Sequence, residues 1–261
     1  MSSIESIAGL VLVLVTAALM GLLSLPPRKG ARPQVFFRPI PGLQRLRRAL
    51  GLAVENGTRL HISLGKASGI STSNAASLVA LSVLERVAQM SSISDRPPVA
   101  TSGDGALSIL SQDTLHAAYR TMNALDQFDL TRGRLAGVTP FSYVAGVLPV
   151  IHTEAVSTHV LIGNLGPEAA LLAEAADRER AFTLAASDSL PGQAVLYAAA
   201  EEALIGEEVY ALPAYLQAGP IHRASLRVED ILRWVVILLV LAGALLRLFG
   251  PMFGFRGSFL P

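Results

Sequence analysis

The sequence predicts a doubly wound, mostly parallel α/β domain that carries one transmembrane helix at each end. Strand-like and helix-like segments alternate five times in the middle of the chain, and a long apolar run lies near each terminus. The 261 residues are 51% hydrophobic and only 16% charged. Such a composition fits an ordinary domain to which two lipid-embedded segments have been added.

The predicted strands are short, and a segment with helical spacing of apolar residues follows each of them. They cover residues 59–64, 97–101, 134–138, 156–162 and 181–186. The helix expected over residues 73–90 is apolar almost all round, which is typical of a helix buried on more than one side. After a loop over residues 187–192, the chain up to Leu216 is expected to form a last helical stretch, bent at Gly206 and Pro213. Alternation of this kind favours a parallel sheet with helices on both faces.

The two terminal runs are predicted to be membrane anchors. Residues 7–25 carry no charge and would reach roughly 28 Å as a helix, close to the hydrocarbon thickness of a bilayer. A cleaved signal peptide is the alternative, but the residues before this run include Glu5 and no base. Residues 231–249 hold Arg233 and Trp234 near one end and Arg247 near the other, where interfacial residues belong. A buried core helix is the alternative here.

Charge position predicts the orientation. Seven bases lie between residues 28 and 48, after the first run, and none precedes it. The positive-inside rule then gives a multi-pass protein of the inner (plasma) membrane, with a cytoplasmic central domain and both termini outside. The lipid bilayer would be its first partner.

Four segments follow from these predictions: an anchor over residues 1–25, a basic linker with an amphipathic helix over 26–57, the α/β domain over 58–220, and the second anchor with a short tail over 221–261. In the amphipathic helix Leu43, Leu46 and Leu50 recur at helical spacing beside three arginines. A basic face near lipid headgroups is one interpretation, and an ordinary solvated face is the other.

The candidate ligand site lies in the loops that follow the strands. Ligands of open parallel sheets bind outside the carboxyl ends of the strands, and these loops are rich in Gly, Ser, Asn and Asp. The candidate binding residues are Lys66, Ser68, Ser71, Asp104, Asn164, Glu168 and Asp188. Turns and helix caps need the same residue types, which is the structural alternative.

Several functional classes lack a motif. The chain has no cysteine, which excludes thiolate metal sites and cysteine nucleophiles. The segment Gly65–Gly69 matches neither the phosphate-binding P-loop nor the nucleophile elbow, and no Gly-x-Gly-x-x-Gly follows the first strand. The five histidines are scattered, so no metal is expected, and a net charge of +1 argues against nucleic acid. No catalytic residue and no cofactor can be assigned.

Several segments together resemble a known family. They are residues 38–42, His61 with Gly65, residues 163–168, residues 204–210 and residues 214–216. The chain from Arg38 to Leu248 is similar to a prokaryotic family of two-pass membrane proteins that carry a domain of unknown function, and Ile205-Gly206-Glu207-Glu208 is the most specific part of the likeness. The resemblance implies the two-anchor topology, and it implies no activity, cofactor or catalytic residue.

Two functions are compatible with these observations. The first is a self-assembling scaffold, or a subunit of a larger membrane complex. The apolar helix over residues 73–90 suggests this function. The second is an enzyme or sensor that binds a small anionic metabolite or nucleotide at the strand ends.

Overall fold

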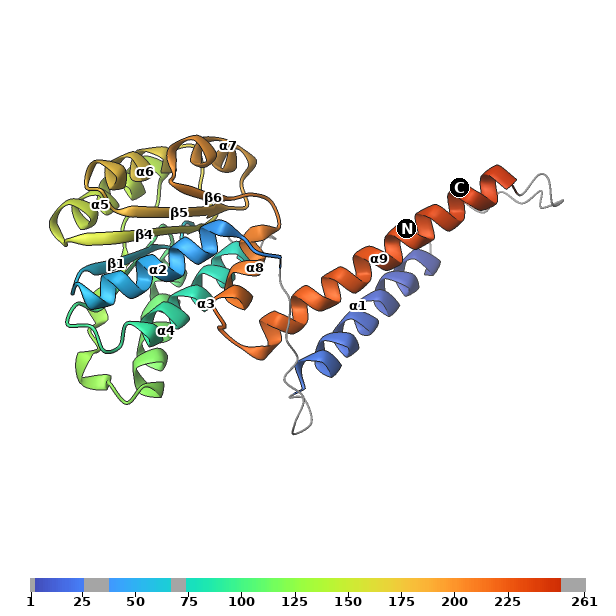
Figure 1. Cartoon of the computed structure of the whole chain (residues 1–261), viewed down its shortest axis with the longest axis horizontal. Coiled ribbons are helices and arrows are strands. Elements are labelled where there is room, and N and C mark those ends of the chain that lie inside the picture. Colours follow the sequence, from blue (N-terminus) through green and yellow to red (C-terminus); the bar gives the residue numbers. More distant parts are fainter. Residues whose placement is uncertain (1–2, 26–37, 67–73, 250–261) are drawn as a thin grey trace. The chain divides into compact units, whose positions relative to one another are not determined.

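The computed structural model describes residues 3–25, 38–66 and 74–249, without the side chains of residues 3–5, 8, 74, 246 and 249. The chain divides into two compact units. Residues 34–218 form an α/β unit, and residues 1–33 with 219–261 form the other. In the second unit α1 (Ser3–Ser24) and α9 (Pro220–Phe249) lie side by side (Figure 1).

The α/β unit is built on one parallel sheet. Its strands are β1 (Arg59–Ser63), β2 (Val99–Ser102), β3 (Gly133–Leu135), β4 (Val156–Gly163), β5 (Phe182–Ser187) and β6 (Glu202–Leu204). Their order is β3-β2-β1-β4-β5-β6, and all five pairings are parallel. The parallel α/β sheet that the alternation predicted is therefore present.

Helices cover both faces of this sheet (Figure 1). On one face lie α2 (Pro41–Glu55), α3 (Asn74–Met90), α4 (Gly105–Thr121) and α8 (Glu208–Tyr215). On the other lie α5 (Pro140–Thr153), α6 (Ala169–Arg178) and α7 (Leu190–Ala199). Two 3₁₀ turns, Leu125–Gln127 and Leu130–Arg132, connect α4 to β3.

Side-chain alternation along the strands assigns residues to the two faces. Leu60 and Ile62 of β1 belong to the larger core cluster with α2, α3 and α8. His61 and Ser63 point to the opposite face, because successive side chains of a strand alternate. That second face is unusually polar, and it holds buried His61, His159 and Thr183 side by side in register.

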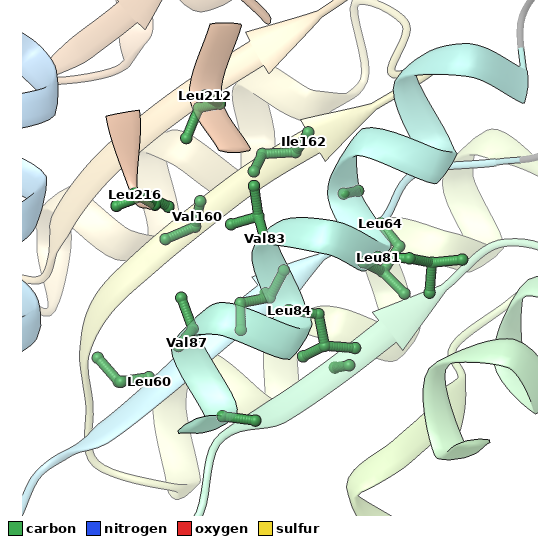
Figure 2. Packing of buried hydrophobic residues seen from close by; sticks show 14 of the residues in the cluster. Leu60, Leu64, Leu81, Val83, Leu84, Val87, Val160, Ile162, Leu212 and Leu216 are labelled. Atoms are coloured by element: carbon green, nitrogen blue, oxygen red, sulfur yellow. The ribbon is translucent and has the colours of Figure 1, made fainter. Parts of the chain in front are cut away.

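The apolar helix α3 is buried within the unit. Figure 2 shows Val83, Leu84 and Val87 of α3 in the same core cluster as the strand residue Val160 and the α8 residue Leu212. The helix also packs against α4. The sheet on one side and a helix on each flank explain why α3 is apolar almost all round.

The amphipathic helix α2 packs on the sheet. Leu43, Leu46 and Leu50 are at most 2% exposed and join the main core. Arg45 on its outer side pairs with Glu202 at 2.5 Å. The apolar stripe of α2 is thus buried in the core of the α/β unit.

The segment expected as one bent helix differs. It forms α7, then β6, then α8. Chain direction changes at Ala200, whose backbone is extended, and at Gly206, whose φ is +63°. Pairing of β6 with β5 overrides the high helix propensity of this alanine-rich stretch.

The predicted flanking transmembrane helices are not supported by the structure. No helix within the described residues is both long and apolar enough to cross a membrane. The helix α9 carries Glu229, Asp230 and Arg233 in its first half. This finding contradicts the predicted anchors, and with them the multi-pass inner-membrane location with a cytoplasmic domain.

Candidate functional site

The strand order reverses between β1 and β4. From β1 the chain proceeds outward through β2 to β3, and from β4 it proceeds outward in the opposite direction to β6 (Figure 1). Ligands of open parallel sheets bind at such a reversal, outside the carboxyl ends of the two strands. The loops that begin at Leu64 and at Asn164 meet there.

Backbone contacts hold these loops together. The amide of Lys66 donates to the carbonyl of Asn164 at 3.1 Å, and the amide of Gly103 donates to the carbonyl of Gly65 at 2.8 Å. Gly65 has φ +64° and Gly163 has φ +133°. A side chain at Gly65 would bring its Cβ to 2.8 Å from the Asn164 carbonyl oxygen, so glycine permits the close approach.

Four of the predicted site residues form two polar pairs at this edge. Lys66 Nζ lies 4.0 Å from Glu168 Oε1, and the two side chains are 20% and 10% exposed. The side-chain amide of Asn164 donates a hydrogen bond from Nδ2 to Asp188 Oδ1 at 2.9 Å. The backbone contact between Lys66 and Asn164 brings the two pairs next to each other.

Partial burial shifts two pKa values here. Burial lowers the pKa of Lys66, and the negative charge of Glu168 offsets part of that shift. Burial raises the pKa of Tyr210, and the charge of Asp188 raises it further. Tyr210 lies on α8 and is 42% exposed, so the helix that follows β6 also contributes to this edge. Sequence reasoning did not select Tyr210, because a tyrosine on an apolar helix carries no motif.

The other predicted residues are placed differently. Asp104 caps α4, and its carboxylate accepts from the amides of Ala106 at 2.9 Å and Leu107 at 3.1 Å. Its role is the helix-capping alternative. Ser68 and Ser71 lie outside the described residues.

A hollow of about 280 Å³ lies elsewhere, beside the amino end of β5. It is lined by Ala173, Asp177, Ala181, Thr183, Ala199, Ala200 and Glu201. Two carboxylates and several alanine methyls offer a ligand little to recognise, whereas Lys66, Asn164 and the carboxylates at the strand ends provide donors and acceptors together. We therefore place the candidate site at the carboxyl ends of β1 and β4.

The site has mixed charge, with one cation and two carboxylates in its two pairs. Within the described part of the chain, no three histidine, aspartate or glutamate side chains are arranged to hold a metal ion. The arrangement offers hydrogen-bond acceptors for hydroxyl groups and a single ammonium group for an anion.

A second polar group, missed by sequence reasoning, lies buried under α5. Tyr143 Oη is hydrogen-bonded to Ser63 Oγ at 2.5 Å and to Thr101 Oγ1 at 3.2 Å. Thr101 Oγ1 is in turn hydrogen-bonded to His61 Nε2 at 3.0 Å. The His61 and His159 ring centroids are 4.5 Å apart. All five residues are at most 1% exposed, and the four that share hydrogen bonds form an internal network beside His159.

Comparison with known proteins finds no curated relative and no solved structure that matches this chain. A family model described as a domain of unknown function, DUF6754, matches residues 2–257. The match agrees with the resemblance to a family that carries such a domain, and it does not bear on a prokaryotic origin. Because the match spans nearly the whole sequence, the chain belongs to the DUF6754 family.

Proposed function

We propose that the α/β unit binds a small polar metabolite that carries hydroxyl groups and an anionic group, at the carboxyl ends of β1 and β4. Nucleotides and phosphosugars belong to this class. The observation that carries the proposal is the pairing of Lys66 with Glu168 and of Asn164 with Asp188 at the point where the strand order reverses.

Each part of the site has a role in the proposal. The Lys66 ammonium group and the amino end of α3 attract the anionic group, because helix amino ends present free amides and a positive dipole. The carboxylates of Glu168 and Asp188 accept from ligand hydroxyls. Two acids beside one base disfavour a ligand that is only anionic, which narrows the class to metabolites with both kinds of group.

The experiment is a thermal-shift screen of the purified full-length chain against nucleotides, phosphosugars and divalent metals. For a ligand that stabilises the protein, Lys66→Ala should weaken binding about tenfold or more, since a charge-assisted hydrogen bond contributes roughly 1.5–3 kcal/mol. The matched control is Arg178→Ala, which removes an exposed base paired with Glu174 on α6. The proposal fails if no compound stabilises the chain, or if Lys66→Ala binds as the wild type does.

Self-assembly is the second candidate function. The apolar helix α3, its first motive, is already packed inside the unit, so another observation must support it. Leu135, Val138 and Phe141 are 48%, 68% and 72% exposed and follow one another beside β3. Because β3 is an edge strand, its open side offers backbone groups to the same edge of a second copy.

Native mass spectrometry over a broad concentration range tests this candidate. A dimer that is lost in Phe141→Asp and kept in Tyr197→Asp, a variant of an exposed aromatic on α7, would support it. A chain that stays monomeric at every concentration would remove it.

A further inference from the structure

Three arginines converge on one carboxylate at a distance from the proposed metabolite site. Arg59 opens β1, Arg132 ends the second 3₁₀ turn, and Arg134 lies in β3; we call them the arginine cluster. All three form ion pairs with the carboxylate of Glu154, the residue that caps the carboxyl end of α5. It precedes β4, so the group lies toward the amino ends of β1 and β4.

Both carboxylate oxygens of Glu154 are engaged. Arg134 Nη1 donates to Oε1 at 2.6 Å, and Arg59 Nη1 donates to Oε2. Arg132 Nη1 lies 3.9 Å from Oε2. Burial raises the pKa of Glu154, but the hydrogen bonds and charges of Arg134 and Arg59 outweigh it, so the pKa is lowered overall.

Positive charge exceeds negative charge in this group. The side chains of Arg59, Arg132 and Arg134 are 13%, 23% and 34% exposed, and that of Glu154 is 16% exposed. The second nearby acid is Asp129, 3.4 Å from Arg132 Nε and 42% exposed. Three cations thus face two anions in a partly dehydrated place, where a charge imbalance is costly.

The pKa of the Arg59 guanidinium is lowered in this environment. Burial lowers its pKa, and the charges of Arg132 and Arg96 lower it further, while Glu154 raises it. Its Nε is buried, and no side chain or carbonyl of the described residues accepts from it. Burial lowers the pKa of the neighbouring His61 and the charges of His159 and Arg134 lower it further, so this ring stays neutral beside the arginines.

We infer that the arginine cluster binds a small oxyanion of the phosphate class beside Glu154, at a second site separate from the carboxyl ends of the strands. Guanidinium groups present parallel N–H donors that match the oxygens of phosphate. An oxyanion supplies the missing negative charge and an acceptor for buried donors. A network that only ties α5 to the sheet would need neither the surplus cation nor the free Nε.

The test measures the melting temperature and the affinity of the full-length chain for inorganic phosphate, with chloride at equal ionic strength as the control for screening. Phosphate should raise the melting temperature of the wild type more than chloride does. Arg134→Gln, at the most exposed member of the cluster, should weaken phosphate binding roughly tenfold. Glu154→Gln should strengthen the phosphate response, because it removes the internal anion that competes for the arginines.

Two further variants keep the result decisive. If Glu154→Gln does not fold, Arg132→Gln takes its place. Like Arg134→Gln, it should weaken phosphate binding. Arg178→Ala, which removes an exposed base paired with Glu174 on α6, should leave the phosphate response unchanged, so that a loss of binding in Arg134→Gln cannot be ascribed to a general loss of positive charge. A wild type that responds equally to phosphate and chloride, or an Arg134→Gln variant that binds as the wild type does, would overturn the inference.

Discussion

The buried histidine pair should make the stability of the α/β unit fall as the pH is lowered below 6.5. His61 and His159 are both 0% exposed. Burial lowers the pKa of His159 to about 3. Burial lowers that of His61 well below its usual value, and the charges of His159 and Arg134 act in the same direction. Both rings are therefore neutral in the folded protein at neutral pH.

The sign follows from proton binding. In the unfolded chain a histidine takes up a proton near pH 6.5, whereas the folded His159 remains neutral down to about pH 3. The unfolded state binds more protons throughout this window, so acidification favours unfolding. Each pH unit below 6.5 costs about 1.4 kcal/mol per histidine, so His159 alone should cost about 2 kcal/mol at pH 5. His61 adds a loss of the same sign.

Urea unfolding of the full-length chain at pH 7, 6 and 5, followed by circular dichroism, measures the effect. His159→Phe retains a ring and removes two ring nitrogens that have no hydrogen-bond partner among the described residues. Its loss between pH 7 and 5 should be smaller than that of the wild type by about 2 kcal/mol. The control is Leu52→Ala, at a half-exposed position on α2 that has no titratable group, and it should keep the wild-type slope.

A wild type whose free energy of unfolding is constant between pH 7 and 5 would refute the reasoning. So would a His159→Phe variant with the wild-type slope. Asp129 and Glu154 do not imitate the effect, because their pKa values are lowered and they lose their contribution only below the ordinary range of an acid, under pH 4.5.

The same unfolding assay checks two further predictions. Gly65→Ala should cost roughly 1–3 kcal/mol, because it strains a positive φ and crowds the carbonyl of Asn164; Gly51→Ala, in open space on α2, should instead stabilise by about 0.5–1 kcal/mol. Leu46→Ala should cost about 2–5 kcal/mol and the half-exposed Leu52→Ala less than about 0.5 kcal/mol. Equal effects within either pair would contradict the packing described for that position.

Local patterns anticipated most of the sheet. Strands β1, β4 and β5 were found because short apolar runs end in loops rich in glycine and polar residues. β6 was missed, because three residues beside an alanine-rich helix carry no local strand signal and become a strand only by pairing with β5. The apolar runs near the termini predicted membrane anchors, which the described residues do not support.

The candidate site was partly predictable. Lys66, Asn164, Glu168 and Asp188 could be selected because residues after parallel strands gather at one edge of the sheet. That rule says nothing about pairing, so it also selected Asp104, whose carboxylate is occupied by the start of α4.

The sequence by itself determined most of the strands and helices, though not β6, as well as the residues that follow those strands and the burial of α3 on several sides. Only the tertiary structure decided that β4 returns beside β1. That return places His159 against His61 and brings Glu154 to Arg59 and Arg134. The residues of these groups are far apart in the chain, and no local periodicity encodes such contacts. They arise because the strands after β1 and after β4 are added in opposite directions along one sheet.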